Sequence, residues 1–72
     1  MISIEILDNG IYDGHFLFDS ETKKCVIDAS KQGGKSERVI KNYQKKYVSK
    51  NGVKKSFFDY CMTLKNKRVL NV

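Results

Sequence analysis

The residues of this chain whose types and spacing could do chemistry are chiefly basic. Arg38, Lys41 and Lys45 recur at intervals of three and four, so a helix would place them on one face. Such a row can displace the counterions condensed on a nucleic-acid backbone. Lysine outnumbers arginine and reads bases less well than the bidentate guanidinium, so we predict contact with phosphates. The residues expected to take part are Lys31, Lys35, Arg38, Lys41, Lys45, Lys46, Lys50, Lys54 and Lys55.

Charge is segregated along the sequence. Residues 1–30 hold two lysines against six acids, a net −4, and residues 31–72 hold twelve basic groups against two acids, a net +10. Together the halves give the overall charge of +6. A strongly positive half attracts polyanions, although net charge bears on association and not on the fold. The alternative is a solvated helix face that only keeps a small protein in solution.

Residues 29–36 read Ala-Ser-Lys-Gln-Gly-Gly-Lys-Ser, between an expected strand and an expected helix. The segment resembles a relaxed P-loop, in which glycine N–H groups surround a phosphate, the lysine supplies charge and the serine holds magnesium. P-loop enzymes also need a parallel sheet and a second acidic strand, for which 72 residues leave no room. We therefore interpret the match as chance. We keep the weaker prediction that Gly33, Gly34 and Lys35, at a helix start, could seat one phosphate.

Candidates for catalysis or metal binding are sparse. His15 is the only histidine, and Cys25 and Cys61 form no Cys-x-x-Cys pair, so a Cys/His zinc site within one chain is excluded. The aspartates of the first half stand in expected turns, without the spacing of a calcium-binding EF-hand. No arrangement for nucleophilic catalysis surrounds His15. We expect no catalytic residue, no metal and no cofactor, and hence no enzyme.

Both cysteines lie among apolar residues, and we expect them to be small buried side chains rather than a disulfide. The N-terminus lacks the basic start of a signal peptide, and no apolar run approaches the roughly 20 residues of a membrane span. We therefore predict a soluble, cytoplasmic protein without a membrane partner, either monomer or homodimer. Abundant Lys, Asn, Ile, Tyr and Phe have AT-rich codons, which fits a phage or mobile-element origin.

The elements that must position these residues begin with strands. Apolar and polar residues alternate over 2–7, the period of a half-buried strand. Asn9-Gly10 predicts a hairpin turn, with Asp13-Gly14 as a bulge in the returning strand. Residues 15–18 and 24–28 are further expected strands, which completes an antiparallel meander. Its apolar face would carry Ile2, Ile4, Ile6, Phe16, Phe18 and either Val26 or Cys25 with Ile27.

The second half predicts two helices that cover this face. The first begins near Ser36 and ends at Asn51-Gly52, where glycine accepts the left-handed conformation. A rival interpretation makes Asn51-Gly52 the turn of a second hairpin. The second helix begins at Ser56, whose spacing to Asp59 resembles a capping box, and runs through Lys65. The expected apolar stripe of the first helix is Val39, Ile40, Tyr43 and Tyr47.

We therefore predict one small α+β domain over 1–72, with an acidic β-sheet half at 1–30 and a basic helical half at 31–72. Its architecture is a three-stranded antiparallel β-meander followed by two C-terminal helices, β-β-β-α-α, with 68–72 as either a frayed tail or a short fourth strand. A chain this short buries only about 60% of its surface, which leaves little room for a substrate cavity.

The expected function is non-enzymatic binding of a nucleic-acid backbone through the lysine-rich first helix. The alternative is a small regulator or inhibitor, encoded by a phage or mobile element, that docks on a larger host protein such as a nucleic-acid-processing or defence enzyme. The same lysines would then lie on an acidic surface of that protein, and an exposed sheet edge could add to its sheet.

Overall fold

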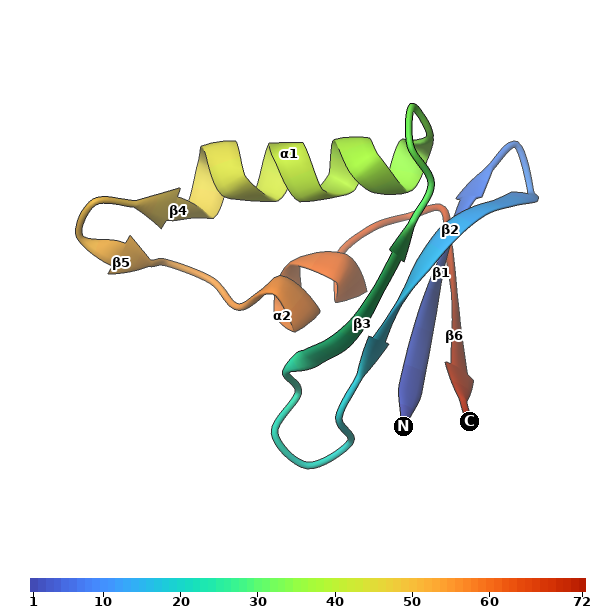
Figure 1. The fold of residues 1–72 in the computed structure, drawn as a ribbon, viewed down its shortest axis with the longest axis horizontal. Coiled ribbons are helices and arrows are strands. Elements are labelled where there is room, and N and C mark those ends of the chain that lie inside the picture. Colours follow the sequence, from blue (N-terminus) through green and yellow to red (C-terminus); the bar gives the residue numbers. More distant parts are fainter.

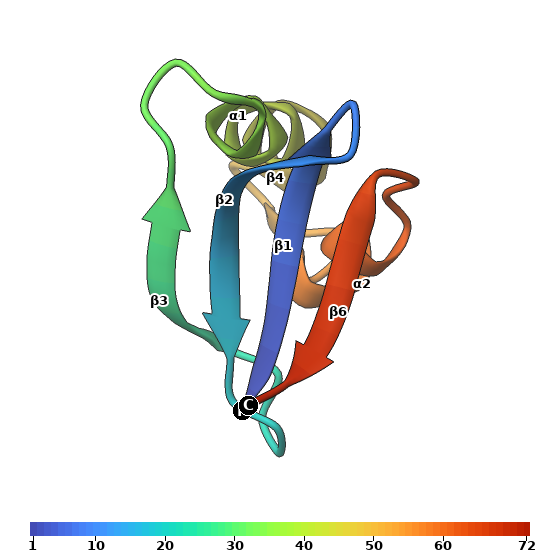
Figure 2. The same cartoon turned by 90° about the vertical axis from the view of Figure 1, so that its right-hand side faces the viewer.

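Four strands form one antiparallel sheet in the order β3-β2-β1-β6 (Figures 1 and 2). The computed structural model describes residues 1–72 and confirms the mixed α+β class. Two helices lie on one face of the sheet, and a two-stranded hairpin separates them in the chain (Figure 1). The sheet strands are β1 (Ile2–Asp8), β2 (Ile11–Phe18), β3 (Cys25–Ser30) and β6 (Lys67–Asn71). The other elements are α1 (Lys35–Tyr47), β4 (Val48–Ser49), β5 (Gly52–Val53) and α2 (Phe57–Met62).

The meander of β1, β2 and β3 forms as its local sequence predicts. Asn9 and Gly10 have φ angles of 52° and 78°, which a tight hairpin turn requires. Opposite Ile6, strand β2 carries both Asp13 and Gly14, because the register shifts between the pairs on either side. The predicted bulge is therefore confirmed, and it lies at the end of the sheet from which α1 begins (Figure 2).

The core lies between the sheet and the two helices. Of the isoleucines and phenylalanines expected on the apolar face, all but Ile2 are buried there with one stripe of α1 and one face of α2, and Ile2 is partly buried. Aromatic rings join the layers: the Phe57 ring centroid lies 4.9 Å from that of Phe16 and 5.0 Å from that of Tyr43, both edge-on. The eight core residues are Ile4, Ile6, Phe16, Phe18, Val39, Tyr43, Tyr60 and Cys61.

The strand order differs from a plain three-stranded meander, because the C-terminal segment is not a frayed tail. Strand β6 pairs antiparallel with β1, from Ile2 opposite Asn71 to Ile6 opposite Lys67. The Met1 amino group also donates to the Val72 carbonyl oxygen at 2.9 Å. Strand β1 is therefore an interior strand, and β3 and β6 are the two edges.

The prediction that the first helix ends at Asn51-Gly52 is wrong, and the rival hairpin is right. Helix α1 ends at Tyr47, and Val48 pairs with Val53 in the β4-β5 hairpin. Gly52, at φ 121°, and the Ser49 hydroxyl, which accepts from the Asn51 N–H at 3.3 Å, stabilise its turn. β-Branched Val48 also favours the extended backbone.

Helix α2 is shorter than predicted at its C-terminal end. Ser56 is its N-cap, since its hydroxyl accepts from the Asp59 N–H at 3.1 Å, as the capping pattern predicts. The helix stops at Met62 instead of running through Lys65. The Thr63 N–H and hydroxyl both donate to the Tyr60 carbonyl oxygen, and these tight local bonds replace a further helical turn.

The prediction that both cysteines are buried is wrong for Cys25. Cys61 is fully buried, but Cys25 is exposed on edge strand β3, and both thiols are free. Val26 and Ile27 of the same strand are 46% and 49% exposed. The apolar run of β3 therefore stays largely uncovered, because the buried sheet residues lie on β1 and β2.

Candidate nucleic-acid interface

Helix α1 places Arg38, Lys41 and Lys45 together on its exposed face, opposite the stripe that it buries. Arg38 and Lys45 form no ion pair. The ammonium of Lys41 lies 3.6 Å from a carboxylate oxygen of Glu37, one turn earlier. An exposed pair of this kind stabilises a helix by only about 0.3–0.5 kcal/mol, so Lys41 remains available to a stronger anion. We call these three residues the basic row.

Four more predicted lysines lie near the C-terminal end of α1 and in or after the β4-β5 hairpin. Lys46, Lys50 and Lys54 are exposed, and none forms an ion pair. Lys55 is half-buried, with its ammonium 5.6 Å from the centre of the Tyr47 ring, a cation–π contact. Lys46 lies in the last turn of α1, Lys50 in the turn of the β4-β5 hairpin, and Lys54 and Lys55 directly after β5. The hairpin extends beyond the C-terminal end of α1 (Figure 1).

Lys31 and Lys35 have a different environment, because acids of the β1-β2 region reach them. The ammonium of Lys31 lies 3.6 Å from the Asp13 carboxylate, and that of Lys35 lies 3.7 Å from the Asp8 carboxylate. Lys41 has an ion pair of nearly the same length with Glu37, so Lys31 and Lys35 differ from the basic row in position and not in pairing.

One N–H group of the predicted phosphate site at the start of α1 already binds a carboxylate of the protein. The Lys35 backbone N–H donates to an Asp13 carboxylate oxygen at 2.6 Å. The buried Ser36 hydroxyl, in the first turn of α1, accepts from the Lys31 N–H of the preceding loop at 2.8 Å. A carboxylate at a helix N-terminus uses the same N–H group and dipole that a phosphate would use. A phosphate at this position would have to displace the Asp13 carboxylate from the Lys35 N–H.

Asp13 makes the stability of this loop dependent on pH. The N–H of Lys35, and then the charge of Lys31, lower the pKa of the Asp13 carboxyl below its ordinary 3.8. Since the folded pKa is depressed, its stabilising effect is present at neutral pH and is lost as pH falls through the folded value. We expect Asp13→Asn to melt below the native protein at pH 7 and to approach it near pH 2.

Circular-dichroism melting curves across pH would measure this difference. The control is Glu21→Gln, which removes one exposed carboxylate in the β2-β3 turn that forms no ion pair. If the melting temperature of Asp13→Asn lies below that of the native protein by the same amount from pH 7 to pH 2, the Asp13 carboxylate does not stabilise the loop.

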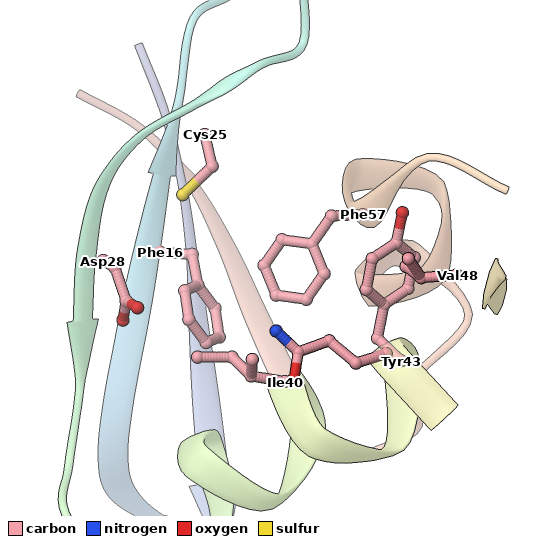
Figure 3. A pocket seen from close by; sticks show the side chains of 8 residues that line it. Phe16, Cys25, Asp28, Ile40, Tyr43, Val48 and Phe57 are labelled. Atoms are coloured by element: carbon pink, nitrogen blue, oxygen red, sulfur yellow. The ribbon is translucent and has the colours of Figure 1, made fainter. Parts of the chain in front are cut away.

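A groove of about 290 Å³ opens between β3, α1 and α2 (Figure 3), and sequence reasoning did not predict it. Its lining is mainly apolar, with Asp28 and Gln44 as the polar groups. Asp28 is paired across the sheet with Phe16, so it belongs to the helix-facing side of β3. One Asp28 carboxylate oxygen accepts from the Ser30 N–H at 2.9 Å, and the carboxylate forms no ion pair. The full lining is Phe16, Cys25, Asp28, Ile40, Tyr43, Gln44, Val48 and Phe57.

The groove does not hold an activated nucleophile. Partial burial, and then the neighbouring Asp28 charge, raise the pKa of the Cys25 thiol above 9.0. Burial raises the pKa of Cys61 to about 12. Both thiols are therefore protonated at neutral pH, whereas a reactive cysteine needs a lowered pKa.

No group of side chains in the chain has the composition of a metal site. His15 accepts or donates one hydrogen bond, at 2.6 Å to the Tyr12 hydroxyl, and has no carboxylate or thiol partner. No helix is both long and apolar enough to cross a membrane.

Comparison with known proteins found no matching family model, no matching curated protein and no matching solved structure.

Proposed function

We propose that this protein binds the sugar-phosphate backbone of a nucleic acid, without catalysing a reaction, through the basic row of α1. The observation that carries the proposal is the common direction of Arg38, Lys41 and Lys45, on the face of α1 away from the core. A row of this kind binds by releasing counterions and needs no sequence recognition. We place this binding in the cytoplasm.

The dimensions of the row fit several successive phosphates. From residue 38 to residue 45 the helix rises about 10 Å, at about 1.5 Å per residue. Long lysine and arginine side chains widen this reach on both sides. Lys46, Lys50 and Lys54 add positive charge at and beyond the C-terminal end of α1, and Lys31 and Lys35, paired with Asp13 and Asp8, lie at its start.

Binding to oligonucleotides over a range of salt concentrations tests the proposal. Three phosphate contacts give a slope of log K against log salt of about −2 for a single strand and about −3 for a duplex. Fluorescence anisotropy from 50 to 300 mM salt would measure these slopes. The proposal is wrong if neither DNA nor RNA binds at 50 mM salt, or if the affinity is independent of salt.

A second candidate function is docking on a larger host protein, such as a nucleic-acid-processing or defence enzyme, as its regulator or inhibitor. The observation that favours it is the unpaired edge of β3, with Val26 and Ile27 about half exposed. An unpaired edge can accept a strand from a partner. A host protein retained by the native protein in a pull-down, together with no binding to any oligonucleotide, would favour this candidate.

A further inference from the structure

We infer that the groove between β3 and α1 holds one unstacked guanine base of a single-stranded nucleic acid whose phosphates lie on the basic row. This inference rests on the proposed function and adds the strand type and the base. Three parts of the groove and its rim match three parts of a nucleotide: an apolar lining for the base ring, polar groups for the base edge, and cations for the phosphates.

The lining of the groove suits a flat, largely apolar ring. Ile40, Val48 and Phe57 form walls from three different elements, as Figure 3 shows. The volume of about 290 Å³ exceeds that of a single purine base, so one base can enter the groove without displacing its walls. Contact of a base with such side chains is sequence-tolerant by itself, so it supplies affinity and not selection.

Asp28 supplies the selection, because its carboxylate offers only acceptors. Guanine presents two neighbouring donors on its pairing edge, the N1–H and the exocyclic amino group, which a carboxylate can accept together. The other three bases place a ring or carbonyl acceptor beside their donor, and that acceptor would repel the carboxylate. Asp28 has no ion pair to give up, and the Gln44 amide at the same groove can donate to the guanine carbonyl oxygen.

The basic row begins at the next residue along the groove wall. Ile40 and Gln44 line the groove, and the residue after each of them, Lys41 and Lys45, lies on the exposed face of α1. Because successive residues lie about 100° apart around a helix, Lys41 and Lys45 stand beside the groove wall and not in the groove. We infer that their long side chains bind the phosphate of a nucleotide whose base enters the groove. In a duplex the base would first have to leave its stack and its partner, which favours a single strand.

A single base change in a short oligonucleotide tests the inference. The probes are eleven-nucleotide thymine strands with a central guanine, adenine, cytosine, thymine or abasic site, measured by anisotropy at 100 mM salt. We expect the guanine strand to bind roughly fivefold to 100-fold more tightly than the others, as for a good bidentate base contact. A guanine strand annealed to its complement should lose this advantage.

Asp28→Asn should remove the preference for guanine, to within about twofold, and leave the salt slope unchanged. The control is Glu21→Gln, which makes the same change of net charge in an exposed turn away from the groove. It should keep the preference. Equal melting temperatures of the two variants would show that both are folded.

Cys25 offers a separate measurement of occupancy, because its thiol lines the groove and Cys61 is buried. Alkylation by N-ethylmaleimide at pH 8.5, read by mass spectrometry, should modify Cys25 first. We expect the guanine strand to slow this reaction several-fold in the native protein and not in Asp28→Asn.

The outcomes separate this inference from the proposed function. Equal affinity for the guanine and abasic strands, with salt-dependent binding intact, would overturn the inference and leave backbone binding in place. Loss of all binding would overturn both. Protection of Cys25 by a protein from lysate, and by none of the strands, would assign the groove to a protein partner and also overturn it.

Discussion

The triple variant R38E/K41E/K45E is expected to lose nucleic-acid binding while it stays folded. From the counterion relation, each phosphate contact contributes a factor of about five at 0.15 M salt, so removing three contacts lowers the affinity roughly 100-fold. The carboxylates also repel the phosphates, and the loss should exceed this value. The neutral variant R38Q/K41Q/K45Q should lose affinity by the roughly 100-fold factor alone. Its slope of log K against log salt should be less negative than that of the native protein by about two to three. Fluorescence anisotropy would measure both variants.

The control for this prediction reverses three charges elsewhere. K23E/K24E/K65E makes the same change of net charge, from +6 to zero, at exposed positions in the β2-β3 turn and after α2. We expect it to lose only a small part of the affinity. If it loses as much as the α1 variant, attraction to the whole molecule explains binding and the basic row is not a site.

The charge reversal also tests whether α1 tolerates the change. K41E puts a second carboxylate one turn from Glu37. In the native protein the Lys41 ammonium lies 3.6 Å from the Glu37 carboxylate at this place. Like charges at this spacing destabilise a helix by only about 0.2–0.5 kcal/mol. Melting curves should therefore move little, and the neutral variant avoids the repulsion altogether.

The features that could be predicted from sequence are those set by short-range periodicity. The spacing of Arg38, Lys41 and Lys45 placed them on one helix face, and the stripe from Val39 to Tyr47 on the other. Asn9-Gly10 and Ser56 determine a turn and a helix start through their own backbone bonds. Each of these patterns depends on residues within about four positions.

The features that could not be predicted depend on pairs far apart in the chain. Strand β6 pairs with β1 from the opposite end of the chain, and the five residues of β6 by themselves do not indicate which strand they pair with. The helix signal before Asn51-Gly52 and the hairpin signal around it were both present locally. The hairpin is favoured by two sets of contacts. Val48 pairs with Val53, and the rings of Tyr43 and Tyr47 pack against Tyr60 of α2.

The candidate site shows the same division. The basic row followed from spacing, but the groove exists only because β3 lies opposite α1 in the folded chain. Likewise, nothing near Lys35 in the sequence indicates that Asp13 fills the start of α1. That contact joins the β2 bulge to the glycine-containing loop and so determines where α1, with its basic row, begins.

Gly14→Ala is expected to unfold much of the protein at 25 °C. Gly14 has φ 105°, and a methyl group there would overlap the Ser36 hydroxyl and lie 2.6 Å from the Ser36 Cβ. Ser36 is fully buried in the first turn of α1 and cannot move aside. Backbone strain of about 1–3 kcal/mol and overpacking of about 1–3 kcal/mol together approach the few kcal/mol by which so small a domain is stable. A thermal melt followed by circular dichroism would measure the loss.

Gly10→Ala separates the two contributions. Gly10 also has a positive φ, 78°, but a methyl group there would meet no atom within 4 Å. This variant therefore carries the backbone strain without the overlap, and we expect its melting temperature to fall by several degrees, at about 4–8 °C per kcal/mol. If Gly14→Ala melted at the same temperature as Gly10→Ala, Ser36 would have moved. The junction between the β2 bulge and α1 would then be too loose to determine where the basic row lies.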